Sequence, residues 1–218
     1  MSQHKIEIFG IPQSNFTRAV RIVCEEKGID YLHLPVRPHS DEANDIHPLG
    51  KVPGLRHGEV RLGESRAIVA YLDRQYPELP MMPASPPALA ARLEQWASIV
   101  MTAVDPVLIR QYVFAYLFPA TADGAVDRAA VDATLPQMEA LVAMLDRALA
   151  GADYLAAGSF SFADAILLST LAPVRLFPEG KRAIDAAPHL GRYFSLHSAR
   201  PSFVATDPWS APAAGEGA

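Results

Sequence analysis

Hydrophobic and polar residues alternate in two short segments near the start of the chain, which predicts two β-strands. Ile6 and Ile8 alternate with polar neighbours, and Leu32 and Leu34 share one face of the segment 31–36. Between these segments apolar residues recur at helical spacing, and Gly28 follows them as a C-terminal stop: Phe16, Ala19, Val20, Val23 and Cys24. A strand, a helix and a second strand in this order predict a βαβ unit with parallel strands.

The next part of the pattern predicts a hairpin and a helix. The segments 54–57 (GLRH) and 60–62 (VRL) have a strand pattern and are separated by the turn residues Gly58 and Glu59. An amphipathic pattern from Ser65 to about Tyr76 predicts the helix that closes this unit.

Beyond residue 76 the pattern changes from mixed to helical. Five prolines fall within residues 77–87, a composition that suits a stiff, extended linker. Three long helical patterns follow, the first with a predicted bend at Pro106, and then two shorter helices and a frayed tail, 210–218. The prediction is therefore an α/β domain over residues 1–80, a linker over 77–87 and an all-α domain over 88–210.

Composition narrows the function classes. The 218 residues carry a net charge of −5 without a clustered basic face, which argues against a nucleic-acid partner. No uninterrupted apolar run approaches the roughly 18 residues of a membrane span, and the first residues lack the apolar core of a signal peptide. A single cysteine, Cys24, excludes an internal disulfide, and it lies on an apolar helical stripe, so we expect a buried thiol in a cytoplasmic protein. The seven histidines show no metal-binding spacing, so no metal is expected.

Two dipeptides suggest a binding site for a small peptide. Val52-Pro53 precedes a predicted strand, and a cis bond there would turn the N–H and C=O groups of Val52 outward to pair with an extended peptide. Glu64-Ser65 stands at a predicted helix N-terminus, where free N–H groups favour an anion and the carboxylate suits an ammonium group. Together they predict a pocket for a peptide with a free α-amino group and a free α-carboxylate.

These motifs resemble the glutathione S-transferase family, in particular its cytosolic, serine-type, bacterial-like members. The similarity rests on HPLGKVPGL at 47–55, GESRAIVAYL at 63–72, and FSFADAILL at 160–168, where Ser161 and Asp164 are predicted to form a capping box. The resemblance spans nearly the whole chain. It implies a thioredoxin-like N-terminal domain, a helical C-terminal domain and a homodimer.

The resemblance also implies the residues of the site. The family places its catalytic hydroxyl or thiol just after the first strand, where this chain has Ser14 followed by Asn15 instead of the family's more usual proline. Either Ser14 or Asn15 is the expected donor to the glutathione sulfur, and Ser14 is also a preferred helix cap. Glutathione-binding roles are implied for His39, Lys51, Val52, Pro53, Glu64 and Ser65.

Three further features have both a functional and a structural interpretation. Asp105 matches an acidic residue that in some relatives reaches the partner subunit's glutathione, but an ordinary Asp-Pro step explains it equally well. Most of an aromatic cluster is expected in the core, with one or two members beside an electrophile: Tyr112, Phe114, Tyr116 and Phe118. Trp209 is a further candidate for closing that pocket.

The function implied is conjugation of the glutathione thiol to a small electrophile, with glutathione as co-substrate and detoxification as the setting. One alternative is a non-catalytic or weakly catalytic protein that binds glutathione or hydrophobic ligands; another is a glutathione-dependent reductase. A third is a protein-interaction domain of the kind attached to translation factors. Within the family, the reaction stays open among conjugation, reduction, isomerisation and dehalogenation.

Overall fold

The computed structural model describes residues 5–119, 121, 124–156 and 158–209. These residues fall into two compact units. The first reaches Ile68 and includes the segment from Arg200 onward, and the second runs from Val69 to Ala199. The predicted frayed tail, 210–218, lies outside the described residues.

A four-stranded sheet, in the order β2-β1-β3-β4 among the described residues, forms the centre of the first unit. β1 (Ile6–Phe9) pairs in parallel with β2 (Tyr31–Leu34) and antiparallel with β3 (Gly54–His57), which pairs antiparallel with β4 (Val60–Gly63). The predicted βαβ unit and hairpin are therefore confirmed.

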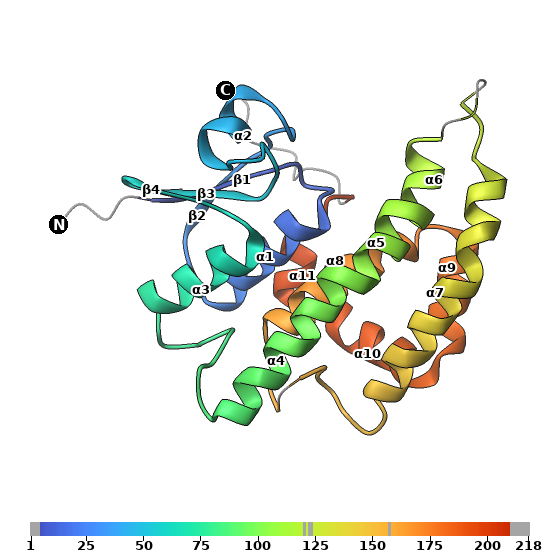
Figure 1. Cartoon of the computed structure of the whole chain (residues 1–218). Coiled ribbons are helices and arrows are strands. Elements are labelled where there is room, and N and C mark those ends of the chain that lie inside the picture. The colour runs from blue at the N-terminus through green and yellow to red at the C-terminus, as the bar shows by residue number, and fades with distance from the viewer. Residues whose placement is uncertain (1–4, 120, 122–123, 157, 210–218) are drawn as a thin grey trace. The chain divides into compact units, whose positions relative to one another are not determined.

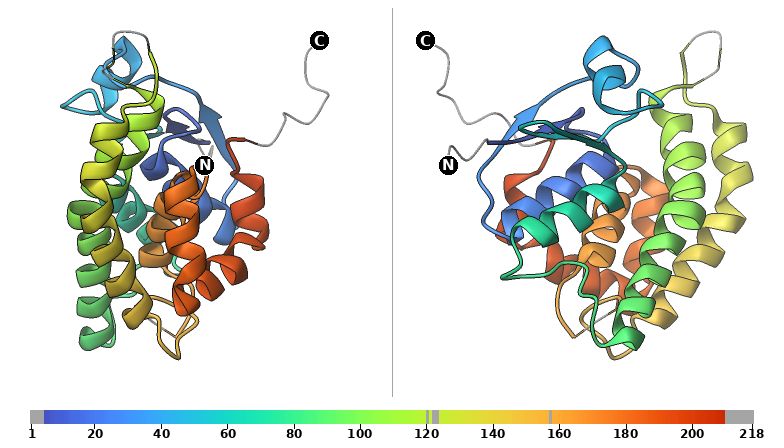
Figure 2. Two further views of the ribbon diagram at one scale, coloured as in Figure 1. Left: turned by 90° about the vertical axis from the view of Figure 1, so that its right-hand side faces the viewer. Right: turned by 60° about the vertical axis from the view of Figure 1, so that its left-hand side comes forward.

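Helices cover both faces of this sheet. α1 (Asn15–Glu26) lies on one face and α2 (Asp41–Ile46) on the other (Figures 1 and 2). α1 buries its apolar stripe, and Gly28, at φ +63°, adopts the left-handed conformation that glycine takes without strain just after a helix. α2 was not predicted, because six residues with only Ala43 and Ile46 buried are too few for a periodic pattern.

α11 (Pro201–Ala205), near the end of the described chain, packs against α1. The guanidinium of Arg200 binds the carboxylate of Glu26, with Nε to Oε1 at 2.8 Å and Nη2 to Oε2 at 2.6 Å. Nearer the start of α1, Arg18 donates from Nη2 to the carbonyl of Phe203 at 2.9 Å, and its guanidinium lies 4.0 Å from Asp207. The last described segment thus runs antiparallel to α1 and leads toward the N-terminal end of that helix.

α3 (Ser65–Gln75) begins in the first unit, and the helical second unit continues from it. The proline-rich segment is anchored inside this second unit. Met81 is buried, the Asp73 carboxylate accepts hydrogen bonds from the backbone N–H groups of Met81 and Met82, and the Met81 carbonyl accepts one from Phe162. These bonds fix the middle of the segment that was predicted as a linker.

A long helix, Pro87–Leu117, follows and is interrupted twice by π-helical turns. It comprises α4 (Pro87–Ile99), η1 (Val100–Val104), α5 (Asp105–Val107), η2 (Leu108–Val113) and α6 (Phe114–Leu117). The π turns flank Pro106, which removes a backbone donor, so the helix accommodates the proline by local unwinding where a bend was predicted.

This long helix passes a length and composition test for a membrane span, which the sequence analysis had not expected. An 18-residue stretch within it has a mean hydropathy of 1.2, and half of that stretch is buried inside the protein. The core helix of a soluble protein passes the same test, so this observation carries no membrane assignment.

α8 (Phe162–Val174) forms the centre of the helical unit and contacts α4, both π turns and α10. The predicted capping box is present: the Ser161 backbone N–H and hydroxyl both donate to the Asp164 carboxylate, at 3.0 and 2.8 Å. The same carboxylate also accepts hydrogen bonds from the Leu155 N–H at 2.7 Å and the Tyr193 hydroxyl at 3.1 Å. Three further helices complete the described part of this unit: α7 (Arg128–Ala148), α9 (Pro178–Ala186) and α10 (Pro188–Ser198).

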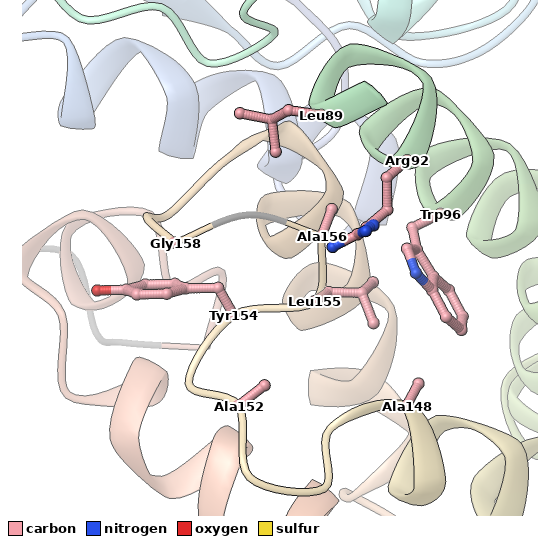
Figure 3. Close-up of a pocket in the computed structure, with 9 residues that line it drawn as sticks. All are labelled: Leu89, Arg92, Trp96, Ala148, Ala152, Tyr154, Leu155, Ala156 and Gly158. Atoms are coloured by element: carbon pink, nitrogen blue, oxygen red, sulfur yellow. The ribbon is translucent and has the colours of Figure 1, made fainter. Parts of the chain in front are cut away.

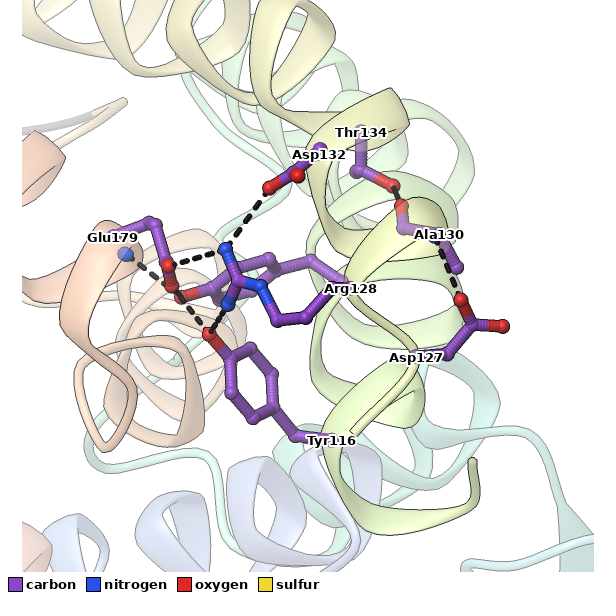
Figure 4. Close-up of polar contacts among 9 residues, drawn as sticks. Tyr116, Asp127, Arg128, Ala130, Asp132, Thr134 and Glu179 are labelled. Atoms are coloured by element: carbon purple, nitrogen blue, oxygen red, sulfur yellow. Dashed lines mark hydrogen bonds and ion pairs between the residues drawn. The ribbon is translucent and has the colours of Figure 1, made fainter. Parts of the chain in front are cut away.

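Glu179 joins three of these helices through a polar network (Figure 4). Its carboxylate accepts hydrogen bonds from the hydroxyls of Tyr112 and Tyr116 and pairs with the Arg128 guanidinium at 3.0 Å. Burial alone would raise the pKa of Glu179, but the hydrogen bonds from Tyr116, Arg128 and Tyr112 outweigh it and lower the pKa to about 2. The network therefore fixes the end of the long helix against α7 and α9.

Candidate active site

Strand register brings the predicted site residues to one end of the sheet. Phe9, at the end of β1, pairs with Gly54, and Gly54 pairs with Gly63 at the end of β4. Ser14 follows β1, Val52-Pro53 precedes β3, and Glu64-Ser65 follows β4. Residues that are far apart in sequence therefore gather along one edge of the first unit.

Ser14 is the N-cap of α1, as its position suggested. Its Oγ accepts a hydrogen bond from the Thr17 N–H at 3.2 Å, and its own carbonyl accepts one from Arg18 at 2.8 Å. A serine hydroxyl has two acceptor sites and one O–H donor, so the capping bond leaves the proton available for a ligand. Ser14 is half-buried, whereas Asn15 is only 4% exposed.

The Val52–Pro53 bond is cis, as predicted. Pro53 is buried, Val52 is half-buried, and the Lys51 side chain is exposed. Exposure of the ammonium group suits Lys51 to a ligand carboxylate.

His39 is exposed and stands in the left-handed region at φ 64°. Its backbone N–H donates to the Gly50 carbonyl at 2.6 Å. This bond joins the His39 loop to the segment that carries Lys51 and Val52.

Glu64 is the second non-glycine residue with a positive φ among those described, at 65°. Its carbonyl accepts a hydrogen bond from the Ile68 N–H at 3.0 Å, so Glu64 stands directly before the first turn of α3, and its side chain is 70% exposed. Ser65, the first residue of α3, is buried at 3% exposure. The carboxylate thus faces solvent at a helix N-terminus, beside backbone N–H groups suited to an anion.

Sequence reasoning missed one residue of this site, His47. Its Nε2 lies 3.3 Å from Oε1 of Glu64, and the ring is buried. The sequence displays His47 at the head of HPLGKVPGL, but its partner lies 17 positions away, so only the fold reveals the pair.

The structure also shows the surroundings of the remaining candidate residues, Cys24, Asp105 and Trp209. Cys24 is buried, and burial raises the pKa of its thiol, which confirms a core cysteine. The Asp105 carboxylate is buried and binds Nε of Arg110 at 3.0 Å. Trp209 is 50% exposed. Among the described residues no group of three or more His, Cys, Asp or Glu side chains is arranged to hold a metal ion.

The aromatic cluster divides between core and surface. Tyr112 is fully buried, and Phe118 is 68% exposed and packs edge-to-face against Phe114, with ring centroids 5.0 Å apart. The hydroxyls of Tyr112 and Tyr116 each donate a hydrogen bond to the Glu179 carboxylate. Phe114 and Phe118 are therefore the members that remain candidates for a ligand contact.

The helical unit also has an open cavity of about 420 Å³ between the start of α4 and the segment after α7 (Figure 3). Arg92 and Trp96 extend toward it from α4, and Leu155 faces them. None of the predicted site residues lines this cavity, so the site is identified by its chemistry and not by cavity size.

Comparison with known proteins agrees with this geometry. The glutathione S-transferase N-terminal domain family matches residues 8–86, and the C-terminal domain family matches residues 95–201. The chain is 30% identical over 210 residues to glutathione S-transferase 3 of Zea mays, covering 92% of each protein.

The chain belongs to the glutathione S-transferase family.

Solved structures support the same assignment. The apo structure of glutathione S-transferase III matches with a TM-score of 0.81 and 30% identity, covering 96% of this chain and all of that one. Glutathione S-transferase I from mais, solved with an atrazine glutathione conjugate, matches with a TM-score of 0.82 and 26% identity over 95% of this chain and 100% of that one. The predicted fold class is confirmed: a small sheet domain and a helical domain.

As a glutathione S-transferase the protein is an enzyme, and the comparisons do not favour the binding-protein, reductase or interaction-domain alternatives. The family uses glutathione as a co-substrate. The serine-type, bacterial-like subtype remains a prediction, as do the roles of individual site residues and the domain limits at residues 80 and 88.

Proposed function

We propose that the enzyme conjugates glutathione to small electrophiles, with Ser14 as the donor that stabilises the glutathione thiolate. The observation that supports this role is the cap geometry. The Ser14 oxygen accepts from the Thr17 N–H and keeps its own proton for a sulfur atom at the helix end. The partial positive charge at the N-terminus of α1 favours the same anion.

Ser14 is a better candidate than Asn15 for the donor to the glutathione sulfur, because its side chain is more exposed. The Asn15 side chain is buried and already has interactions within the protein, whereas the Ser14 side chain is half-buried at the sheet end. A donor that must reach a ligand needs an open face.

The remaining site residues would hold the peptide. The Val52 backbone would pair with the cysteinyl part of glutathione as a strand does, and Lys51 and His39 would bind the glycine carboxylate. Glu64 would bind the γ-glutamyl ammonium, and the Ser65 hydroxyl with the N-terminus of α3 would bind the neighbouring carboxylate. Pro53 would fix the backbone that presents Val52.

The reaction follows from this arrangement. The thiol loses its proton to solvent, and the resulting thiolate, stabilised by the Ser14 O–H, attacks an electrophilic carbon. A carbon–sulfur bond forms as the leaving group departs with its bonding electrons. A thiol ordinarily titrates near pH 8.5, and lowering that value by about two units would leave the bound thiol mostly ionised at neutral pH.

The experiment is a titration of thiolate absorbance in the enzyme–glutathione complex, beside conjugation kinetics with an aryl halide. Ser14→Ala should keep most of the glutathione affinity, while turnover at neutral pH falls by roughly ten- to a hundredfold, since one pKa unit is about 1.4 kcal/mol. Activity should partly recover in alkali.

Asn15→Ala is the matched variant and should have much less effect. The reverse pattern would make Asn15 the donor and Ser14 only a helix cap. Full rate and an unshifted pH profile in both variants would refute thiolate activation at this helix end.

We also propose that the enzyme acts as a cytoplasmic homodimer, because family members usually pair and the apolar long helix needs covering.

A further inference from the structure

His47 contacts both segments that the proposed glutathione site depends on. Its Nδ1 accepts a hydrogen bond from the Leu49 N–H at 3.1 Å, and its Nε2 lies 3.3 Å from Oε1 of Glu64. Its backbone carbonyl accepts from the Gly50 N–H at 2.8 Å. Through Gly50 the residue is linked to His39, and through the chain to Lys51.

The contacts of its two ring nitrogens define the protonation state of the His47 side chain. Because Nδ1 accepts a hydrogen bond, the ring must be neutral, with its single proton on Nε2. That proton faces Glu64. The ring therefore accepts on one side and donates on the other, as only one neutral tautomer can.

Close packing prevents the ring from moving aside. A Cβ atom at Gly63 would lie 2.3 Å from Cδ2 of His47, so the ring presses directly on the backbone of β4. The next residue is Glu64, in its left-handed conformation at φ 65°. His47 thus fixes the backbone from which the Glu64 carboxylate projects.

We propose that His47 is a positioning residue that keeps this site competent for glutathione only while its ring is neutral, so that protonation of His47 opposes glutathione binding. The inference rests on the proposed role of Glu64 as the partner of the γ-glutamyl ammonium.

Two physical effects act in the same direction. A protonated ring carries N–H donors on both nitrogens, so Nδ1–H would confront the Leu49 N–H and the loop to Lys51 would lose its anchor. The imidazolium would also compete with the ligand ammonium for the Glu64 carboxylate. Because linkage is reciprocal, bound ligand must keep the ring neutral to lower pH.

The other charged groups on the elements around the ring are paired with one another or lie away from it. On α2, Asp45 pairs with Arg61 of β4 at 3.2 Å. On β3, Arg56 pairs with Glu7 of β1, and His57 stands at the far end of the strand. Asp41 and Glu42 occupy the first turn of α2, away from its His47 end. Among the described residues, Glu64 is the ionisable group that contacts the His47 ring, at 3.3 Å.

The test measures binding of S-methylglutathione by calorimetry at pH 8 and pH 5.5. This probe has no free thiol, so thiol ionisation cannot produce a pH effect. Histidine is the side chain that ordinarily changes charge in this range. The native enzyme should bind about tenfold more weakly at pH 5.5, within the usual range of coupling between two sites.

His47→Asn should bind at pH 8 and should lose no affinity at pH 5.5, because its amide oxygen can accept the Leu49 N–H without titrating. His57→Asn, the same change at a histidine of the same unit, should retain the tenfold loss. Equal losses in the native enzyme and His47→Asn, or no loss in the native enzyme, would overturn the inference. No binding by the native enzyme at pH 8 would instead overturn the proposed function, and this inference with it.

A second measurement does not depend on the variant's folding. In the native enzyme labelled with ¹⁵N-histidine, the ring nitrogens report protonation of His47 directly. With S-methylglutathione bound, the ring should stay neutral to lower pH than in the free enzyme. The effect should be smaller with an S-methylglutathione analogue that lacks the α-amino group of the γ-glutamyl residue. An identical titration with and without ligand would refute the coupling.

Discussion

At the scale of single residues, Glu64 and Ser65 offer the most direct test of the proposed peptide site. Each of Glu64→Ala and Ser65→Ala should weaken glutathione binding more than it lowers stability, because each removes a partner for a charged ligand group. A charge-assisted hydrogen bond contributes about 1.5–3 kcal/mol, so affinity should fall by roughly tenfold or more. Retention on glutathione resin and thermal melting of the same samples would measure the two effects.

Glu59→Ala is the matched control for Glu64→Ala, since Glu59 is an exposed carboxylate in the hairpin turn of the same unit. It should leave retention unchanged. If both site variants are retained as strongly as the native enzyme, the proposed peptide site is wrong.

The sequence predicted this site through local motifs and missed what only folding brings together. Val52-Pro53 and Glu64-Ser65 are adjacent pairs whose chemistry is visible in sequence, and the cis bond at Val52–Pro53 is present. His47 has an ordinary position in sequence, and its packing against Gly63 and its contact with Glu64 arise only when the chain folds. Such a contact leaves no periodic signal.

At the scale of elements, Glu179 connects the end of the long helix with α7 and α9, and its charge makes that connection dependent on pH. The pKa of Glu179 is lowered to about 2 from an ordinary value of 4.5, so the folded state prefers the ionised form. The stabilisation is present above pH 4.5 and is lost as pH falls toward 2.

Glu179→Gln should therefore lower the free energy of unfolding by about 1–2 kcal/mol at pH 7, allowing for solvent screening, and by roughly half of that or less at pH 3. Urea titrations at the two pH values would measure this. Asp132→Asn removes an exposed partner of the same Arg128 and should change stability by less than about 0.5 kcal/mol. A Glu179→Gln deficit that is equal at both pH values would contradict the ionic role.

The start of α8 depends on Asp164 in a different way, because its partners are buried donors. Asp164→Ala would leave the Leu155 N–H and the Ser161 N–H without their acceptor, whereas the Tyr193 hydroxyl keeps the Asp164 carbonyl at 3.5 Å. Each buried donor left unpaired costs about 1–3 kcal/mol, so the loss of stability should be at least about 2 kcal/mol.

Ser161→Ala removes only the hydroxyl that donates to Asp164 at 2.8 Å and keeps the carboxylate for the backbone N–H groups, so it should cost only about 1 kcal/mol. Thermal or urea unfolding of the two variants would compare them. Equal losses would show that Asp164 acts only as the partner of Ser161.

Elements with a periodic pattern or a clear turn were predicted correctly, whereas α2 and the π turns were not. α1, the hairpin and α8 follow from periodicity and capping residues. α2 has too few buried residues to show a period, although Ser40, which accepts from the Ala43 N–H, is a recognisable cap. The π turns around Pro106 depend on how neighbouring helices tolerate a lost backbone bond, and the sequence of the helix alone does not contain that information.

At the scale of the whole molecule, the sequence pattern predicts a mixed unit followed by a helical unit. It does not predict that α11, near the end of the described chain, belongs to the first unit. α11 belongs with the first unit because Arg200 and Arg18 bind Glu26, Phe203 and Asp207. These bonds join residues more than 170 positions apart, as in the pair of Arg200 with Glu26, beyond the reach of any local pattern.

The last prediction concerns assembly. An 18-residue stretch of the long helix Pro87–Leu117 has a mean hydropathy of 1.2, yet only half of that stretch is buried within one chain. Apolar surface of that kind is stabilised when a partner covers it, at about 25 cal/mol for each Å² removed from water. Light scattering at micromolar concentration should therefore give twice the chain mass of 23.6 kDa. A monomer mass under these conditions would refute the dimer. A charged substitution at an exposed position of the helix, such as Ala91→Glu, should shift the dimer toward monomer. The control substitution Ala91→Ser should not.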